Sequence, residues 1–203
     1  MKIALIGVSG RVGTRLLAEM LKRGHSVTGI ARDTANVASR PQLTLKAADA
    51  NQSSQLAPLL RDHDVVVSAL RFAGADAKAL IAAVKQAQVR RLMVVGGAGS
   101  LKVASGSALA DTPGFSAAYK PEAEAARAFL ELLRSDPELN WTFLSPSAEF
   151  SPGARTGKFR IGGDELLVDA KGRSAISMED FAIAFVDELE VPRHLRKRFT
   201  VGY

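Results

Sequence analysis

The sequence of 203 residues contains no cysteine and only three histidines. Without cysteine there can be no disulfide, no thiolate zinc or iron–sulfur centre and no thiol nucleophile, and the absence is consistent with a reducing compartment. The histidines, His25, His63 and His194, are isolated from one another, so no spacing predicts a metal site. A Gly-x-Ser-x-Gly motif is also missing, which leaves serine hydrolase chemistry without its nucleophile signature.

Long hydrophobic runs are missing as well. The apolar run Ile3–Ile6 meets Gly7 at once and is too short for the core of a signal peptide. Nowhere do roughly 18 apolar residues follow one another, which is the length that a membrane-spanning helix requires. We therefore expect a cytoplasmic protein with no membrane partner.

The composition is ordinary for a globular protein, with 47% hydrophobic and 24% charged residues. The length predicts a single domain over 1–203, with substrate-side loop and helix elements over 147–180, and we expect a monomer or homodimer. The net charge of +6 favours an anionic partner. Residues 1–100 carry 14 Lys and Arg against 6 Asp and Glu, whereas 101–203 carry 13 against 15. The basic cluster Arg193–Arg198 is interpreted as a solvated turn, and nucleic-acid binding is not expected.

Short apolar runs bounded by turn residues recur along the chain, and helical patterns separate them. Such runs are typical of parallel strands that crossover helices bury on both faces. The pattern predicts an α/β fold: a Rossmann-type, doubly wound, mainly parallel sheet, with a glycine-rich loop excursion over 147–174 before a final helix that Ser177 caps. Other helices are expected from the first strand to Gly24, over 76–88 and over 121–134. The expected strands are Ile3–Ile6, Val27–Ile30, Leu43–Leu45, Val65–Val67, Leu92–Val95, Trp141–Leu144 and Phe199–Val201.

A glycine motif follows the first strand directly and opens the first helix, with glycines at positions 7, 10 and 13. In this setting the first glycine permits a tight turn, the second lets a phosphate approach the backbone, and the third lets the helix pack against the strand. N–H groups at the start of the helix can then hold the pyrophosphate of a dinucleotide. A glycine-rich turn without a ligand is the alternative, but position and spacing favour an NAD(P) site.

Arg32 stands at the end of the second strand, where an NAD site usually has an acidic residue that binds the ribose 2′-hydroxyl. A guanidinium suits a 2′-phosphate instead, so NADP is preferred and NAD stays open. Arg11 in the glycine loop is a second candidate for the same phosphate. Asp33 argues against NADP, because a carboxylate at this place favours the 2′-hydroxyl of NAD. The Asp-Thr pair also fits a residue that caps the next turn.

Further candidates follow the later strands, because ligands of such sheets bind outside the carboxyl ends. Asp49 is placed near adenine, with a plain turn as an equal alternative. Residues 68–71 are placed along the pyrophosphate and the nicotinamide ribose, and residues 96–100 at the nicotinamide. The candidate cofactor-binding residues are Gly7, Ser9, Gly10, Arg11, Val12, Gly13, Arg32, Asp49, Ala50, Ala69, Leu70, Arg71, Gly96, Gly97, Ala98, Lys120 and Pro146.

These residues resemble the atypical short-chain dehydrogenase/reductase superfamily, and more closely its group of proposed NADH-flavin reductases, with NmrA-like and biliverdin-reductase-B-like proteins as kin. The likeness covers nearly the whole chain. It implies a Rossmann-fold, NAD(P)-binding, cytoplasmic reductase that acts on a flavin or a similar planar acceptor. The matching stretches are Lys2–Gly13, Gly24–Thr28 with Arg32 and Asp33, Val94–Leu101, Trp141–Pro146, Pro152–Gly157, Ile176–Ala182 and Phe199–Tyr203.

The Tyr-x-x-x-Lys pair that is usual in this superfamily is missing. Lys120 follows Tyr119 directly, and Ala123 stands four residues after the tyrosine. A spacing of four places both side chains on one helix face, where the ammonium assists the phenol, whereas adjacent helical residues point about 100° apart. Tyr119 and Lys120 remain the candidate catalytic residues, with a half-buried aromatic at a helix entrance as the alternative for Tyr119. Lys120 is also a candidate contact of the nicotinamide ribose.

Three functions remain open. The first is an NAD(P)H-dependent reductase of a flavin, a quinone or a similar conjugated acceptor, because direct hydride transfer asks the protein mainly for stacking and orientation. Phe72, Phe115, Tyr119 and Phe150 are candidate contacts of the acceptor ring, with core or lid packing as the alternative for each. The second is an NmrA-like redox sensor that binds NADP(H) without turnover. The third is an epimerase or isomerase of the extended branch of the superfamily.

Overall fold

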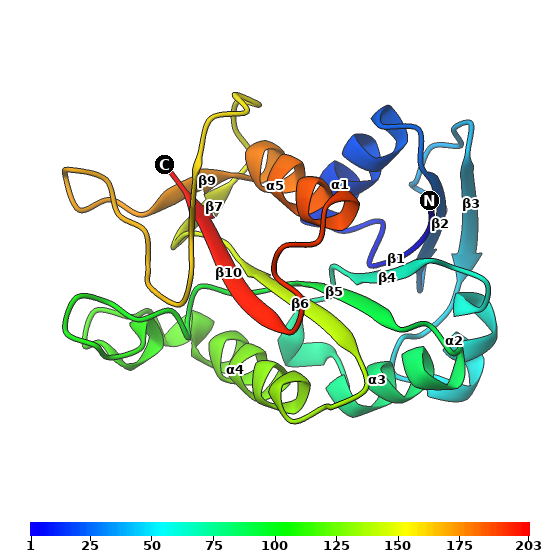
Figure 1. The fold of residues 1–203 in the computed structure, drawn as a ribbon, viewed down its shortest axis with the longest axis horizontal. Coiled ribbons are helices and arrows are strands. Elements are labelled where there is room, and N and C mark those ends of the chain that lie inside the picture. The colour runs from blue at the N-terminus through cyan, green and yellow to red at the C-terminus, as the bar shows by residue number, and fades with distance from the viewer.

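The computed structural model describes residues 1–203 and is built on a central eight-stranded sheet (Figure 1). Its strands are β1 (Lys2–Ile6), β2 (Ser26–Ala31), β3 (Leu43–Ala47), β4 (Val65–Ser68), β5 (Arg91–Val95), β6 (Asn140–Ser145), β8 (Arg160–Gly162) and β10 (Lys197–Gly202). Their order is β3-β2-β1-β4-β5-β6-β10-β8, and every neighbouring pair is parallel except β10 with β8. The winding reverses between β1 and β4, which confirms the predicted doubly wound Rossmann-type sheet.

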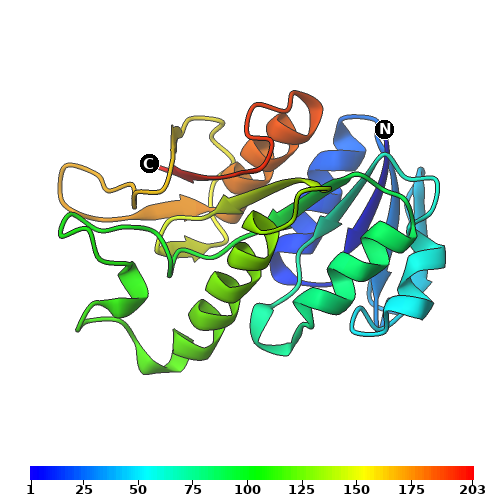
Figure 2. The same ribbon diagram turned by 60° about the horizontal axis from the view of Figure 1, so that its bottom comes forward.

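Helices cover both faces of this sheet. Helices α1 (Arg11–Lys22) and α5 (Met178–Glu190) pack together on one face. The other face carries α2 (Ser53–Leu60), α3 (Ala77–Gln86) and α4 (Lys120–Arg134), as Figures 1 and 2 show. The two layers enclose apolar cores of similar size, with 21 and 23 buried residues, so the central strands are covered on both sides. This explains why those strands are apolar throughout instead of alternating.

The ends of several helices follow signals that are visible in the sequence. Helix α1 stops just before Gly24, which has a φ of +80°, a conformation that glycine adopts without strain. The side chains of Asp76 and Ser177 cap α3 and α5. Helix α2 was not expected, because it spans only 8 residues, contains Pro58 and has no side-chain cap.

The excursion over 147–174 contains two short strands, β7 (Glu149–Ser151) and β8, as predicted. β7 pairs in parallel with β9 (Ala175–Ser177), outside the main sheet. Three 3₁₀ turns lie elsewhere in the loops: η1 (Phe72–Gly74), η2 (Leu109–Asp111) and η3 (Ala117–Tyr119). None of the helices has the length and apolar character needed to cross a bilayer.

Candidate functional site

Close packing of the backbone requires glycine at two positions of the turn between β1 and α1. Gly7 has a φ of +85°, and a Cβ there would lie 2.8 Å from the carbonyl oxygen of Ala69. A Cβ on Gly13 would lie only 2.0 Å from the carbonyl oxygen of Gly7, so no side chain fits between α1 and the end of β1. Gly10 is the N-cap of α1 and offers no side chain to its first N–H groups. Those donors and the helix dipole can therefore serve an anion.

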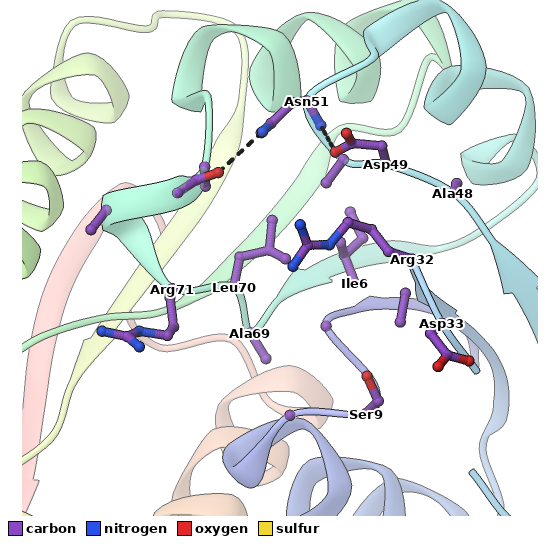
Figure 3. Close-up of a pocket in the computed structure, with 17 residues that line it drawn as sticks. Ile6, Ser9, Arg32, Asp33, Ala48, Asp49, Asn51, Ala69, Leu70 and Arg71 are labelled. Carbon is purple, nitrogen blue, oxygen red and sulfur yellow. Dashed lines mark hydrogen bonds between the residues drawn. The ribbon is translucent and has the colours of Figure 1, made fainter. Parts of the chain in front are cut away.

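A cavity of about 630 Å³ opens beside this turn, at the carboxyl ends of β1, β2 and β4 (Figure 3). It therefore lies at the point where the winding of the sheet reverses, which is where ligands of doubly wound sheets bind. Its volume is in the range of small-molecule and cofactor sites. The lining residues are Ile6, Gly7, Ser9, Gly10, Ala31, Arg32, Asp33, Ala48, Asp49, Ala50, Asn51, Ala69, Leu70, Arg71, Ala73, Gly74 and Ala75.

Arg32 and Asp33 both line this cavity, but their side chains point in different directions. Figure 3 shows the Arg32 side chain reaching from the end of β2 across the cavity towards Leu70, with the Asp33 carboxylate turned away from the guanidinium. An oxygen of that carboxylate accepts a hydrogen bond of 2.8 Å from the backbone N–H of Ala35. Asp33 thus closes a local turn, while Arg32 has no ion-pair partner. The cavity therefore presents a guanidinium without an ion-pair partner and a carboxylate that is already engaged in a local hydrogen bond.

The far end of the cavity is formed by the segments after β3 and β4. An Asp49 carboxylate oxygen accepts the backbone N–H of Asn51 at 3.0 Å, so Asp49 both lines the cavity and closes a turn. The Asn51 side chain crosses to the segment before α3: its amide donates to the carbonyl of Gly74 at 3.1 Å and accepts from the N–H of Asp76 at 2.8 Å. Asn51 was not among the expected residues, because its role depends on two loops that meet only in the folded chain.

Several expected contacts lie outside this cavity. Arg11 is exposed on the first turn of α1, beside Val12 and the buried Gly13. Gly96, Gly97, Ala98, Lys120 and Pro146 also lie beyond its lining. The cavity therefore includes only part of the expected contacts, and the roles of the residues inside and beyond it stay predictions.

The candidate catalytic residues lie at the entrance of α4. Tyr119 ends the turn η3 with 66% of its surface exposed, and Lys120 is the exposed first residue of the helix. Tyr119 is therefore not the half-buried aromatic that was the alternative. Neither side chain has a hydrogen-bond or ion-pair partner or lines the cavity, so their catalytic roles remain predictions.

Two of the four aromatic candidates pack on other rings: Phe72 is buried in the core, and Phe150 is partly buried against it. The ring of Phe72 stacks on Phe143 and meets Phe129 edge-on, with centroids 5.9 and 5.6 Å away. Phe150 packs against Phe181 at 4.8 Å. For these two residues the packing alternative is favoured, because each ring already packs against other aromatic rings. Phe115 is half-buried.

A buried acid fastens the excursion that follows β7. Asp180 on α5 is fully buried, and its carboxylate accepts from the N–H and hydroxyl of Thr156 at 2.7 and 2.6 Å, the N–H of Gly157 at 2.8 Å and the hydroxyl of Tyr203 at 2.8 Å. Burial alone would raise the pKa of Asp180, but the bonds from Thr156, Gly157 and Tyr203 outweigh it and hold the pKa below its usual value. Asp180 thus anchors the loop instead of completing a capping box with Ser177.

Ion pairs tie the same loop to α1. Arg155 pairs with the buried Glu19 at 2.9 Å, and Glu179 accepts from Arg15 at 3.1 Å and from the N–H of Gly153 at 2.7 Å. Burial would raise the pKa of Glu19, yet its bonds to Arg155 and Arg23 keep that pKa low. The Arg-Thr-Gly segment that carries part of the family resemblance therefore has a structural role here.

The three histidines and the basic cluster Arg193–Arg198 have structural partners outside the cavity. His25 bonds Glu190, His63 bonds Thr28, and His194 bonds Glu188. Within the cluster, Arg198 is largely buried and pairs with Asp164. No group of three potential ligands gathers at one place to suit a metal ion.

The turn Gly7–Gly13 between β1 and α1 is called the glycine cradle below. A doubly wound sheet with this cradle and a cavity at its switch point defines the class of dinucleotide-binding Rossmann domains. The chain belongs to the NAD(P)H-binding family, whose model matches residues 7–192. It is also 42% identical to the uncharacterized protein YwnB of Bacillus subtilis, over 99% of this chain and 98% of that protein.

Three solved structures share the whole fold. A protein of Burkholderia pseudomallei, named as a proposed exported protein, is 44% identical, with a TM-score of 0.90 and 100% of both chains covered. A proposed epimerase of Bacteroides thetaiotaomicron is 40% identical, with a TM-score of 0.95 and coverage of 100% of this chain and 96% of that one. A proposed NADH-flavin reductase of Streptococcus pneumoniae is 33% identical, with a TM-score of 0.86 and coverage of 100% and 99%. The family resemblance is confirmed, while the names of these relatives differ in the reaction.

Proposed function

We propose that this protein is an NADPH-dependent reductase of a flavin, a quinone or a similar conjugated acceptor. The observation that carries the proposal is the free Arg32 guanidinium inside a cavity whose other end is the glycine cradle. A dinucleotide held by its pyrophosphate at Gly7–Gly13 would direct its adenosine ribose towards β2, where Arg32 can form charge-assisted bonds to a 2′-phosphate. Arg71, with 86% of its side chain exposed, is a second cation on the lining, near the pyrophosphate.

The reaction assigns little chemistry to the protein. NADPH, when bound, would supply the hydride that reduces the acceptor by two electrons together with one proton. In this proposal the chain holds the dinucleotide through the glycine cradle and Arg32. No Tyr–Lys pair is needed when solvent can protonate the reduced acceptor, which fits the exposed positions of Tyr119 and Lys120 outside the cavity. A cytoplasmic location belongs to the same proposal.

The cofactor preference is tested by Arg32→Glu. Because charged hydrogen bonds are worth about 1.5–3 kcal/mol, the ratio of kcat/KM for NADPH over NADH is expected to fall roughly 10- to 100-fold. Arg40→Glu makes the same charge change at an exposed residue outside the cavity and should leave the ratio within about twofold. A ratio that is equal in the two variants contradicts the assignment of Arg32.

The reaction itself is tested by oxidation of NADPH followed at 340 nm with FMN, riboflavin and a quinone as separate acceptors. Turnover with at least one acceptor, above the rate without enzyme, is expected. Tight binding of NADPH with no turnover on any acceptor would favour the sensor function instead. The relative named as an epimerase makes a third assay useful, in which a sugar nucleotide is incubated with the protein and its stereochemistry is followed by NMR.

A further inference from the structure

The segment 72–76 forms one wall of the cavity and is held by two side chains from distant parts of the chain. Ala73, Gly74 and Ala75 face the cavity with no side chain larger than a methyl group, so the wall is mostly backbone. The segment begins with the turn η1 and ends at the cap of α3. Such a connection has few apolar contacts of its own, apart from the ring of Phe72, and therefore depends on outside hydrogen bonds for a fixed shape.

Glu122 in the first turn of α4 holds the start of this wall. One carboxylate oxygen accepts the N–H of Phe72 at 2.7 Å, and the other accepts the N–H of Ala73 at 2.9 Å. The Glu122 side chain is only 27% exposed, which strengthens both bonds. Glu122 is not on the cavity lining, and it contacts the lining through the N–H of Ala73 and, at 3.9 Å, the guanidinium of Arg71.

Asn51 holds the other end of the wall through its bonds to the carbonyl of Gly74 and the N–H of Asp76. Four hydrogen bonds from two side chains therefore fix five consecutive residues. A wall that is ordered before binding spares the ligand the entropy of ordering it.

We propose that Asn51 and Glu122 are positioning residues of the dinucleotide site, which fix the 72–76 backbone as the wall against the adenosine end of the ligand. The inference rests on the proposed function to the extent that the ligand is a dinucleotide. The proposal gives Glu122 a role in ligand binding, although this residue lies in a helix and outside the glycine motif. Loss of either side chain weakens binding of the adenosine half and leaves the nicotinamide half unaffected.

The test measures binding of three probes, NADP⁺, 2′,5′-ADP and nicotinamide mononucleotide, by calorimetry. Asn51→Ala and Glu122→Gln are each expected to weaken NADP⁺ and 2′,5′-ADP roughly 3- to 10-fold, as the loss of one or two hydrogen bonds that order the wall implies. Binding of nicotinamide mononucleotide should stay within about twofold. A general loss of structure would not separate the two halves of the ligand in this way.

Asn36→Ala and Glu124→Gln are the matched controls, since both side chains are exposed and have no hydrogen-bond partner. The double variant of Asn51 and Glu122 should lose less than the product of the two single losses, because both act on the same wall. Unchanged binding of 2′,5′-ADP in both single variants, or fully multiplicative losses, would overturn the inference. Failure of the wild-type protein to bind any of the probes would instead remove the proposed function, and this inference with it.

Discussion

Asp180 offers the sharpest test of how the fold is held together. Its carboxylate is the shared acceptor for four bonds from Thr156, Gly157 and Tyr203, at 2.6–2.8 Å, and it is fully buried. Asp180→Asn keeps the shape of the side chain but replaces one acceptor oxygen with a donor. The amide then faces donors that have lost their partner, and the loop over 152–158 loses its main attachment to α5.

The expected cost follows from the number and exposure of these bonds. Each bond to a charged acceptor is worth about 1.5–3 kcal/mol, but Thr156 and Gly157 are exposed and can bond water instead, so only part of the sum is lost. We expect Asp180→Asn to lower the free energy of unfolding by about 2–4 kcal/mol, and Tm by about 5–15 °C for a chain of this size. Urea titration followed by circular dichroism and a thermal scan measure the two quantities.

Asp187→Asn on the same helix is the control, because Asp187 is 54% exposed and pairs with Arg23 at the surface. Its cost should stay below about 1 kcal/mol. If Asp180→Asn costs no more than this control, the loop does not depend on the buried carboxylate and the reasoning is refuted.

The same carboxylate predicts how the difference between wild type and variant depends on pH. The folded pKa of Asp180 lies below its ordinary value of 3.8, so the folded state binds a proton less readily than the unfolded state. Its contribution to stability is therefore complete above the unfolded pKa and is lost as pH falls through the folded pKa. Glu19 and Glu179, whose pKa values are also lowered, act equally in both proteins. The gap in unfolding free energy should accordingly narrow in urea titrations below pH 4, and a constant gap would contradict this account.

Two glycines give further predictions. Gly13→Ala places a Cβ 2.0 Å from the carbonyl oxygen of Gly7, so α1 must move away from β1; we expect a loss of about 1–3 kcal/mol in stability and at least tenfold weaker NADP⁺ binding by calorimetry. Gly96→Ala places a Cβ 2.3 Å from the ring of Phe143 and should cost a similar amount in urea titration, whereas Gly97→Ala, whose nearest neighbour would be 3.5 Å away, should cost less than about 0.5 kcal/mol. Equal losses of unfolding free energy in Gly96→Ala and Gly97→Ala would show that the loop moves to accommodate the Cβ at position 96, against this prediction.

Elements whose identity depends on their own residues were predictable from the sequence. The continuous apolar run of β4, the glycine turn and the cap at Ser177 each carry a local signal with one physical meaning. Gly96 shows the limit of such signals. The run Gly96-Gly97 suggested a loop shaped for the nicotinamide, but the packing of Phe143 is sufficient to require the first glycine.

Side chains that act across the fold could not be predicted in the same way. Asn51 and Glu122 have no motif around them, and their partners lie 23 to 50 residues away in the sequence. Nothing local indicates that a helix-start glutamate will accept N–H groups from another loop instead of its own helix. The apolar packing of Phe72 is equally non-local, since its two aromatic neighbours come from α4 and β6.

Part of the uneven charge along the chain is used in ion pairs between its two halves. Bases of the first half pair with acids of the second half: Arg15 with Glu179, Arg23 with Asp187 and Glu190, Lys85 with Asp136 and Glu138, and Arg91 with Glu188. Each exposed pair contributes little by itself. Together, the pairs of Arg15, Arg23 and Arg91 join α1 and β5 to α5. With the contact of Arg71 and Glu122, these pairs involve five of the 14 basic residues of the first half, and the other nine have no ion pair. Of the basic residues in that half, only Arg32 and Arg71 line the cavity, and Arg71 has merely a 3.9 Å contact with Glu122. An anionic ligand is therefore favoured by the position of Arg32 and Arg71 on the cavity lining, and not by the net charge, which is spread over many residues outside the cavity.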